Sequence, residues 1–227
     1  MNLNSKLLAL EKIYKTYDDF TKSIDTVCKQ YCSTCCTGDV IMTSIEGYKI
    51  IRHIISEDKI YLFEKIKASL AKQRFRPQTT INALAENCKE EDDAFSEVIK
   101  TPMGKCPLLI NNACSVYSDR PFACRCFVSK EDCAKNECAI IDDFVLAVNN
   151  IFLQVIEHID QDRFTGNLTD ILLFLESEQT RENFLAGRNI TLPSYIVNNR
   201  PLKTLMIPPE HREKTLPIIK SLKDITF

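Results

Sequence analysis

The sequence predicts a mainly α-helical domain with one small β-hairpin and a cysteine-rich metal-binding centre. Apolar residues recur at helical spacing in most of the long segments. Strand patterns are almost absent, and five glycines in 227 residues are few for a fold with many tight turns. Eleven cysteines, most of them at residues 28–36 and 106–133, are the outlying feature of the composition.

Residues 4–31 predict one long helix. Its apolar residues alternate spacings of three and four, a seven-residue repeat, at Leu10, Ile13, Tyr17, Phe20, Ile24, Val27 and Tyr31. The simpler interpretation is that this helix packs on its own domain and delivers Cys28 from its last turn. A protein partner or a homodimer formed through this helix is the alternative.

Two further helices are expected before the second cysteine group. Thr43-Ser44-Ile45-Glu46 has the pattern of a capping box and predicts a helix to about residue 56. Another helix is expected over 58–75, ended by Pro77. Residues 80–100 also have a helical pattern, which stops at a Pro-Met-Gly sequence.

The only β structure expected is a hairpin in the second cysteine group. Its strands, 107–110 and 113–117, flank Asn111 and Asn112, residues that tolerate positive φ. Helices should follow over about 141–160 and from Asn167 to Gly187. Residues 188–227 contain five of the nine prolines and predict an irregular arm with a short helix after Pro209. We therefore expect a helical domain over 1–187 and an arm over 188–227.

The charge and the N-terminus limit the classes of partner and compartment. A net charge of −2 gives no reason to expect nucleic acid or an anionic membrane as partner. The apolar run near the N-terminus is too short for a signal peptide, and no segment approaches the length of a membrane span. A cytoplasmic protein with reduced thiols is expected. Clustered thiols there indicate metal, with disulfides, redox thiols and scattered buried thiols as the alternatives.

Thiolates are soft ligands suited to zinc and to iron–sulfur clusters. The spacing of Cys28, Cys32 and Cys35 allows the backbone to wrap one centre. Cys35 and Cys36 are adjacent, so their side chains diverge. Either they bind different centres, or one of them lies outside the ring of direct ligands. Cations next to cysteines in the sequence could offset the negative charge of the thiolates: Lys29, Lys105, Arg120, Arg125 and Lys130.

The cysteine pattern resembles that of the YkgJ family of cysteine-cluster proteins, described as a putative zinc- or iron-chelating CxxCxxCC domain. The resemblance covers residues 28–138. It is carried by C-x3-C-x2-C-C at residues 28–36, by CPLL at 106, by CSVY at 114 and by RPFACR at 120–125. The first block departs from the family by having three residues between its first two cysteines. The resemblance implies eight metal ligands, namely Cys28, Cys32, Cys35, Cys36, Cys106, Cys114, Cys124 and Cys133.

Outside this set, Cys88, Cys126 and Cys138 are interpreted as small buried hydrophobic residues, although Cys126 and Cys138 could join a site. His53, His158 and His211 have no partner at ligand spacing. The chain is therefore expected to hold an iron–sulfur cluster, of the 4Fe–4S type, or zinc. Iron–sulfur is favoured because eight thiols exceed what one zinc ion needs.

The role of such a centre is open. A more distant resemblance to flagellin lysine N-methylases implies the alternative, an S-adenosylmethionine-dependent protein lysine N-methylase that carries an iron–sulfur cluster. No residues in the sequence mark a site for S-adenosylmethionine, and no catalytic residue stands out. Whether the protein is an enzyme is left open.

Overall fold

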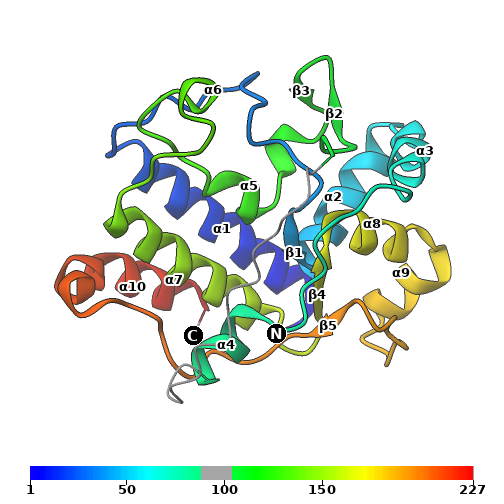
Figure 1. Ribbon diagram of the computed structural model, residues 1–227. Coiled ribbons are helices and arrows are strands. Elements are labelled where there is room, and N and C mark those ends of the chain that lie inside the picture. Colours follow the sequence, from blue (N-terminus) through cyan, green and yellow to red (C-terminus); the bar gives the residue numbers. More distant parts are fainter. Residues whose placement is uncertain (88–103, 227) are drawn as a thin grey trace.

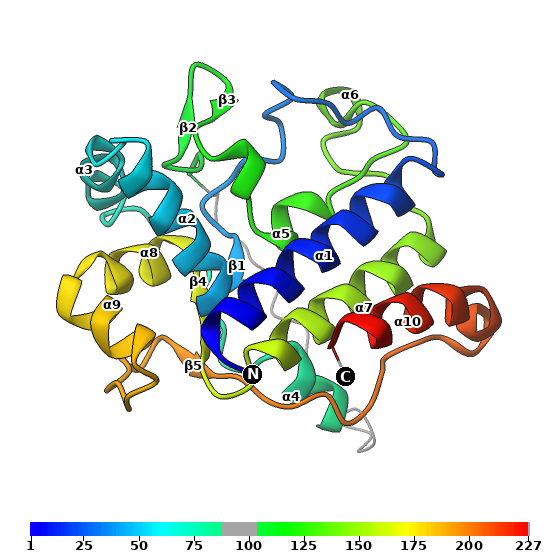
Figure 2. The same ribbon diagram turned by 180° about the vertical axis from the view of Figure 1, so that it is seen from behind.

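The computed structural model of the chain describes residues 1–87 and 104–226. Within these residues it is mainly helical, as the sequence predicts, and it also has two small antiparallel sheets. Helices α1, α7 and α10 lie side by side, and α2, α3, α8 and α9 form a second group (Figures 1 and 2). A small sheet runs between the two groups.

Helix α1 (Leu3–Thr21) is ten residues shorter than expected at its C-terminal end. Its apolar face, including Leu10, Ile13 and Tyr17, is buried against α2, α7 and α10, so the repeat packs on its own domain. After Thr21 the chain leaves the helix, and the backbone N–H of Val27 donates instead to Ser129 O at 2.9 Å. This contact between distant segments overrides the local periodicity. A partner bound through this helix stays a prediction.

Helix α2 (Ser44–Ser56) confirms the predicted capping box and end point. The next helices are shorter than expected: α3 (Tyr61–Ala68) and α4 (Ile81–Asn87). Asp58 takes a left-handed conformation (φ 53°), which excludes it from a helix. Ser69 ends α3 by donating its hydroxyl to Ile66 O at 2.6 Å. The rest of the expected 80–100 helix lies outside the described residues.

The expectation that the hairpin is the only β structure is wrong. A three-stranded antiparallel sheet has the order β1-β4-β5. Its strands are β1 (Ile41–Thr43), β4 (Phe164–Asn167) and β5 (Val197–Asn198). β1 pairs with β4 through Met42 opposite Gly166. Strands this short show no alternation in the sequence, and only the distant pairing defines them.

The predicted hairpin is present as β2 (Leu109–Ile110) and β3 (Ala113–Cys114). Asn111 and Asn112 form its turn with φ of 50° and 62°. Short helical elements follow: the 3-10 turn η1 (Tyr117–Asp119), α5 (Phe122–Arg125) and α6 (Cys133–Asn136). Asp132 caps α6, since its carboxylate accepts from Ala134 N at 3.0 Å.

Helix α7 (Asp143–Ile159) matches the expected segment. The helix expected from Asn167 to Gly187 is two helices, α8 (Leu168–Glu176) and α9 (Glu178–Leu185). Asn167 caps α8, as expected, and Ser177 interrupts the segment by capping α9. Gly187, at φ 65°, follows α9 as the expected stop.

The proline-containing arm packs on the domain. It adds β5 to the sheet, then forms the 3-10 turn η2 (Pro209–His211) and α10 (Arg212–Thr226), a longer helix than expected. α10 lies against α1 and α7, and its Leu222 is 2% exposed. The division at residue 187 stays a prediction. No helix in residues 1–87 or 104–226 is long and apolar enough to cross a membrane.

Candidate metal centre

The two cysteine groups meet at the end of the molecule opposite the termini, where the hairpin, α5 and the segment after α1 gather (Figure 1). A cavity of about 230 Å³ lies between them. Seven of the eight predicted ligands line it: Cys28, Cys32, Cys35, Cys36, Cys106, Cys114 and Cys124. The ten described cysteines form no disulfide among themselves.

Backbone hydrogen bonds join the two groups directly. The N–H of Cys106 donates to Cys36 O at 3.0 Å, and the N–H of Gly38 donates to Gly104 O at 2.8 Å. Between them, Thr37 and Lys105 form an antiparallel bridge. Segments about seventy residues apart in the sequence are therefore paired as neighbouring strands would be, and this pairing places Cys36 beside Cys106.

Helix α5, which carries Cys124, is held at both ends by buried polar side chains. The carboxylate of Glu46 accepts from the N–H of Phe122 at 2.7 Å and so satisfies the start of α5. At the other end, Asn149 donates its amide to Cys126 O at 3.0 Å and accepts from the hydroxyl of Tyr17 at 2.6 Å. Sequence reasoning missed both contacts. The available signal was polar Asn149, which lies one turn from both Val145 and Phe152 along the helix.

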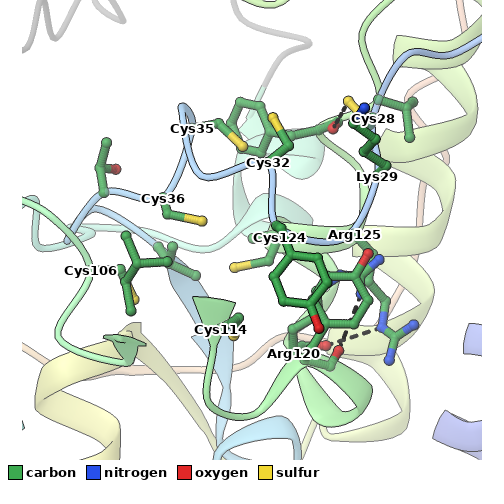
Figure 3. A pocket seen from close by; sticks show the side chains of 18 of the residues that line it. Cys28, Lys29, Cys32, Cys35, Cys36, Cys106, Cys114, Arg120, Cys124 and Arg125 are labelled. Carbon is green, nitrogen blue, oxygen red and sulfur yellow. Dashed lines mark hydrogen bonds between the residues drawn. The ribbon is translucent and has the colours of Figure 1, made fainter. Parts of the chain in front are cut away.

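The seven thiols of the cavity fall into two sets (Figure 3). Cys36, Cys106, Cys114 and Cys124 lie together, and the sulfurs of Cys36 and Cys124 point toward each other. We call these four the inner set. The other three, Cys28, Cys32 and Cys35, lie above them in the same view.

Burial opposes ionisation of three members of the inner set, Cys106, Cys114 and Cys124. Burial raises the pKa of Cys106 to about 11 and raises the pKa of Cys114 as well. The pKa of Cys124 lies well above its usual range because of burial and then the charges of Cys106 and Cys114. These four thiols are close enough to affect one another's ionisation, so a cation among them would relieve a shared repulsion.

Cys35 and Cys36 are coupled to each other. A hydrogen bond between their thiols lowers the pKa of Cys36, and the same bond, with burial, raises the pKa of Cys35. Cys36 is therefore the better-stabilised thiolate of the pair. The charges of Cys106, Cys124 and Cys114 act on Cys36 as well, which places its sulfur among the inner set.

Cys28 is held by the segment that follows α5. Its sulfur accepts a hydrogen bond from the N–H of Ser129 at 3.2 Å and lies 3.3 Å from Phe127 O. Backbone N–H groups directed at sulfur are typical of thiolate sites. The expected delivery of Cys28 by a helix is wrong, because α1 ends at Thr21 and a segment without regular secondary structure carries this cysteine.

The remaining cysteines lie elsewhere. Cys133 begins α6, is not among the residues that line the cavity, and has its sulfur 4.0 Å from Glu131 O. Cys138 is exposed, contrary to the interpretation as a buried hydrophobic residue. Cys126 packs against the core, and burial raises its pKa to about 12. Cys88 lies outside the described residues.

Arg120 and Arg125 adjoin the cavity in different ways. The guanidinium of Arg120 stacks over the ring of Tyr117 at 3.9 Å, and its charge lowers the pKa of Cys114, though burial of that thiol is the larger effect. Arg125 instead donates to the carbonyls of Arg120 and Ser118 and stacks over Tyr14. Arg120 therefore lies in the wall of the thiol cavity, and Arg125 supports the loop that carries it.

The histidines have structural contacts rather than neighbouring thiols. His53 lies between Asp119 at 2.9 Å and Lys59 at 3.0 Å, and so ties η1 to α2. His158 accepts from Leu202 N at 3.1 Å. His211 packs edge-on against Phe144. None of the three lines the cavity.

The donor set fits a thiophilic metal in type but is not closed around one. Within the described ranges, no three Cys, His, Asp or Glu side chains are arranged to hold an ion as they stand. A cysteine sulfur moves by rotation about a single side-chain torsion between staggered positions. The sulfurs that line the cavity can therefore shift without a change in the backbone. Hard cations, which prefer oxygen ligands, are poorly matched to them.

Comparison of the chain with known proteins finds no match among protein-family models, curated proteins or solved structures. The resemblance of the cysteine pattern to the YkgJ family, and more distantly to flagellin lysine N-methylases, stays a prediction.

Proposed function

We propose that this protein binds a metal through clustered thiolates, and that the metal is an iron–sulfur cluster. The observation that carries the proposal is the convergence of seven cysteines, from segments about seventy residues apart, on one cavity of about 230 Å³. The inner set would supply the four ligands, as four thiolates commonly do for [4Fe–4S] clusters. When bound, the cluster would supply one-electron transfer.

The size and number of donors support iron–sulfur over zinc. A structural zinc ion takes four ligands, with Zn–S bonds of about 2.3 Å, and leaves little space between its sulfurs. Seven thiols around a cavity of about 230 Å³ exceed that requirement. Arg120 beside the thiols would offset part of the negative charge that four thiolates bring, as cations near such sites do.

The protein's own residues would position the site. Glu46 and Asn149 hold α5 and therefore Cys124, and the paired backbones of 36–38 and 104–106 hold Cys36 beside Cys106. Val40, Tyr17 and Leu109 line the same cavity and keep water from part of it. Exclusion of solvent tunes the potential of a thiolate-bound cluster.

Elemental analysis tests the proposal. Protein purified without oxygen should contain iron and acid-labile sulfide and should be brown. Cys106→Ser and Cys124→Ser should each lose most of both, because a hydroxyl is a much poorer ligand for a soft centre. The matched control is Cys138→Ser, an exposed cysteine away from the cavity, which should retain wild-type metal.

Stoichiometric zinc without sulfide would replace iron–sulfur by zinc and leave thiolate binding intact. No metal at all, or equal metal in Cys124→Ser, Cys106→Ser and Cys138→Ser, would contradict the proposed ligands.

A further inference from the structure

A second pocket, of about 450 Å³, adjoins the thiol cavity. Residues of α1, α2, η1 and α5 line it. The two pockets share one wall, made by Asp18, Tyr117, Arg120 and Arg125. In Figure 3 the two arginines lie next to each other, on the side of the thiol cavity away from Cys106. Anything bound in the second pocket would therefore lie directly beside the thiols.

The lining of this pocket is positively charged overall. It contains two carboxylates, Glu11 and Asp18, and four cations, Lys15, Lys49, Arg120 and Arg125. The carboxylates are already engaged. Asp18 lies 3.4 Å from Arg125, and Glu11 lies 3.4 Å from Lys49.

Two of the cations remain without an ion pair. Lys49 also pairs with Asp119 at 2.6 Å, so two carboxylates already balance its charge. Asp19 lies one turn along α1 from Lys15, but it pairs with Lys22 at 2.7 Å and not with Lys15. Among residues 1–87 and 104–226, neither Lys15 nor Arg120 forms an ion pair.

The guanidinium of Arg120 is held by Tyr117 but keeps donors without a partner among the described residues. It is stacked on Tyr117 at 3.9 Å, and only its Nη1 donates, to Tyr117 O at 3.2 Å. Its Nε and Nη2 groups have no acceptor within the described chain. A guanidinium fixed by stacking, with two free donors in one plane, matches the two oxygens of a carboxylate or a phosphate.

Arg125 provides the contrast. Its Nε donates to Arg120 O, its Nη2 donates to Ser118 O, and its Nη1 lies near Asp18. All of its donors are engaged and its side chain is 7% exposed, so it fixes the backbone of residue 120 rather than offering a contact.

From this geometry we infer that the pocket binds the oxyanion group of a small molecule, a carboxylate or a phosphate. Arg120 is the bidentate contact, and Lys15 at the rim adds a second charge. The site is built from cations rather than thiols, so it goes beyond metal binding and does not require it. It gives the thiol cavity a neighbouring position for an anionic small molecule.

Calorimetry tests the inference on the whole 227-residue chain at low ionic strength, with iron and zinc content measured on the same samples. The probes are inorganic phosphate and succinate, titrated separately against a chloride reference. The wild type should bind at least one of them saturably, and the tighter probe identifies which oxyanion is preferred. Arg120→Gln should weaken binding about ten-fold or more, because a charge-assisted contact is lost. Lys15→Gln, which leaves the cysteines and their wall untouched, should weaken it by a smaller factor.

The matched control is Lys203→Gln, which removes a lysine that pairs with Glu86 elsewhere in the fold and should bind as the wild type does. Absence of saturable binding of both probes would overturn the inference. So would undiminished binding by Arg120→Gln, or equal weakening by Lys203→Gln. A protein that contains no metal but still binds the anion would contradict only the proposed metal binding. The two proposals can therefore fail separately.

Discussion

Glu46 shows how one buried side chain serves two elements. Its Oε2 accepts from Thr43 N at 2.9 Å, which is one half of the capping box of α2, and also from Thr43 Oγ1 at 2.9 Å. Its Oε1 accepts from Tyr14 OH at 2.8 Å and Phe122 N at 2.7 Å. All four bonds are made at 3% exposure, so the carboxylate is fully satisfied where it is hardest to solvate. The same residue therefore links α1, α2 and the start of α5.

Asp160 is a second buried carboxylate, and its environment is less complete. Its Oδ2 accepts from Ser44 Oγ at 2.6 Å and Ile45 N at 3.1 Å. Its Oδ1 is buried and has no partner among the described residues. Burial raises the pKa of Asp160 to about 7, although Ser44, Lys6, Ile45 and Arg163 all favour the charged form.

This predicts a pH dependence of stability. Asp160 holds its proton to higher pH in the folded state than in the unfolded state, where its pKa is about 4. The folded chain therefore binds more protons between about pH 4 and 7, and the contribution of this group to stability falls as pH rises through that range. Asp160→Asn removes the dependence, so its free energy of unfolding relative to the wild type should rise by a few kcal/mol from pH 4.5 to 7.5. Urea unfolding at both pH values measures the difference.

Asp162→Asn is the matched control with the opposite sign. Burial opposes ionisation of Asp162, but its bond to Lys6 outweighs this and lowers the pKa. Its contribution to stability is present at neutral pH and is lost as pH falls. A difference between Asp160→Asn and the wild type that does not change with pH would show that Asp160 is ionised throughout this range.

At the scale of elements, α2 and α8 approach each other closely at Gly47. A Cβ built on Gly47 would clash with Cγ2 of Ile171 and lie 3.2 Å from Cε of Met42. Ile171 is fully buried, so it has little room to move. The small residue in the middle of α2 is therefore required by the neighbouring helix and not by the backbone.

Gly47→Ala should destabilise the protein by up to about 2 kcal/mol. Alanine favours the helix by about 1 kcal/mol, but overpacking in a close-packed interior costs about 1–3 kcal/mol. The control is Gly38→Ala, where the nearest atom to the new Cβ would be Gly104 O at an ordinary 3.6 Å. Thermal unfolding compares the two. A Gly47→Ala variant as stable as the wild type would mean that Ile171 can move aside.

At the scale of the whole molecule, the cysteine-bearing end contains little regular secondary structure. The main apolar core is formed by α1, α2, α7 and α8, and Leu10, Ile51, Ile151 and Leu172 within it are all fully buried. Segments 22–40 and 104–140 instead form loops, the hairpin and very short helices. Such regions open at lower free energy than a packed core.

Removal of the proposed metal should therefore loosen one end of the molecule and leave the rest folded. Hydrogen exchange after chelation should show lost protection in 22–40 and 104–140, because metal binding contributes to folding where the ligands lie. Amides of α7, which belongs to the main apolar core, should stay protected. Equal loss of protection in α7 would mean that the metal holds the whole fold.

Local chemistry made part of this structure readable from the sequence. The capping box of Thr43 and Glu46, the cap at Asn167 and the Asn111–Asn112 turn are present as predicted, because each depends on residues a few positions apart. The apolar face of α1 is buried as its periodicity indicates. The sulfur donors at the candidate site could likewise be read from the sequence, because they belong to the cysteine side chains themselves.

Only the tertiary structure decided where those donors lie. Val27 bonds to Ser129 and so ends the helical pattern early, and the strands of the β1-β4-β5 sheet exist because distant backbones pair. The same kind of contact gathers seven cysteines on one cavity and leaves Cys133 out of its lining. Such contacts also let Glu46 accept from the N–H of Phe122 at the start of α5. They leave two donors of Arg120 without an acceptor among the described residues. These features arise from contacts between residues far apart in the chain, which local periodicity does not encode.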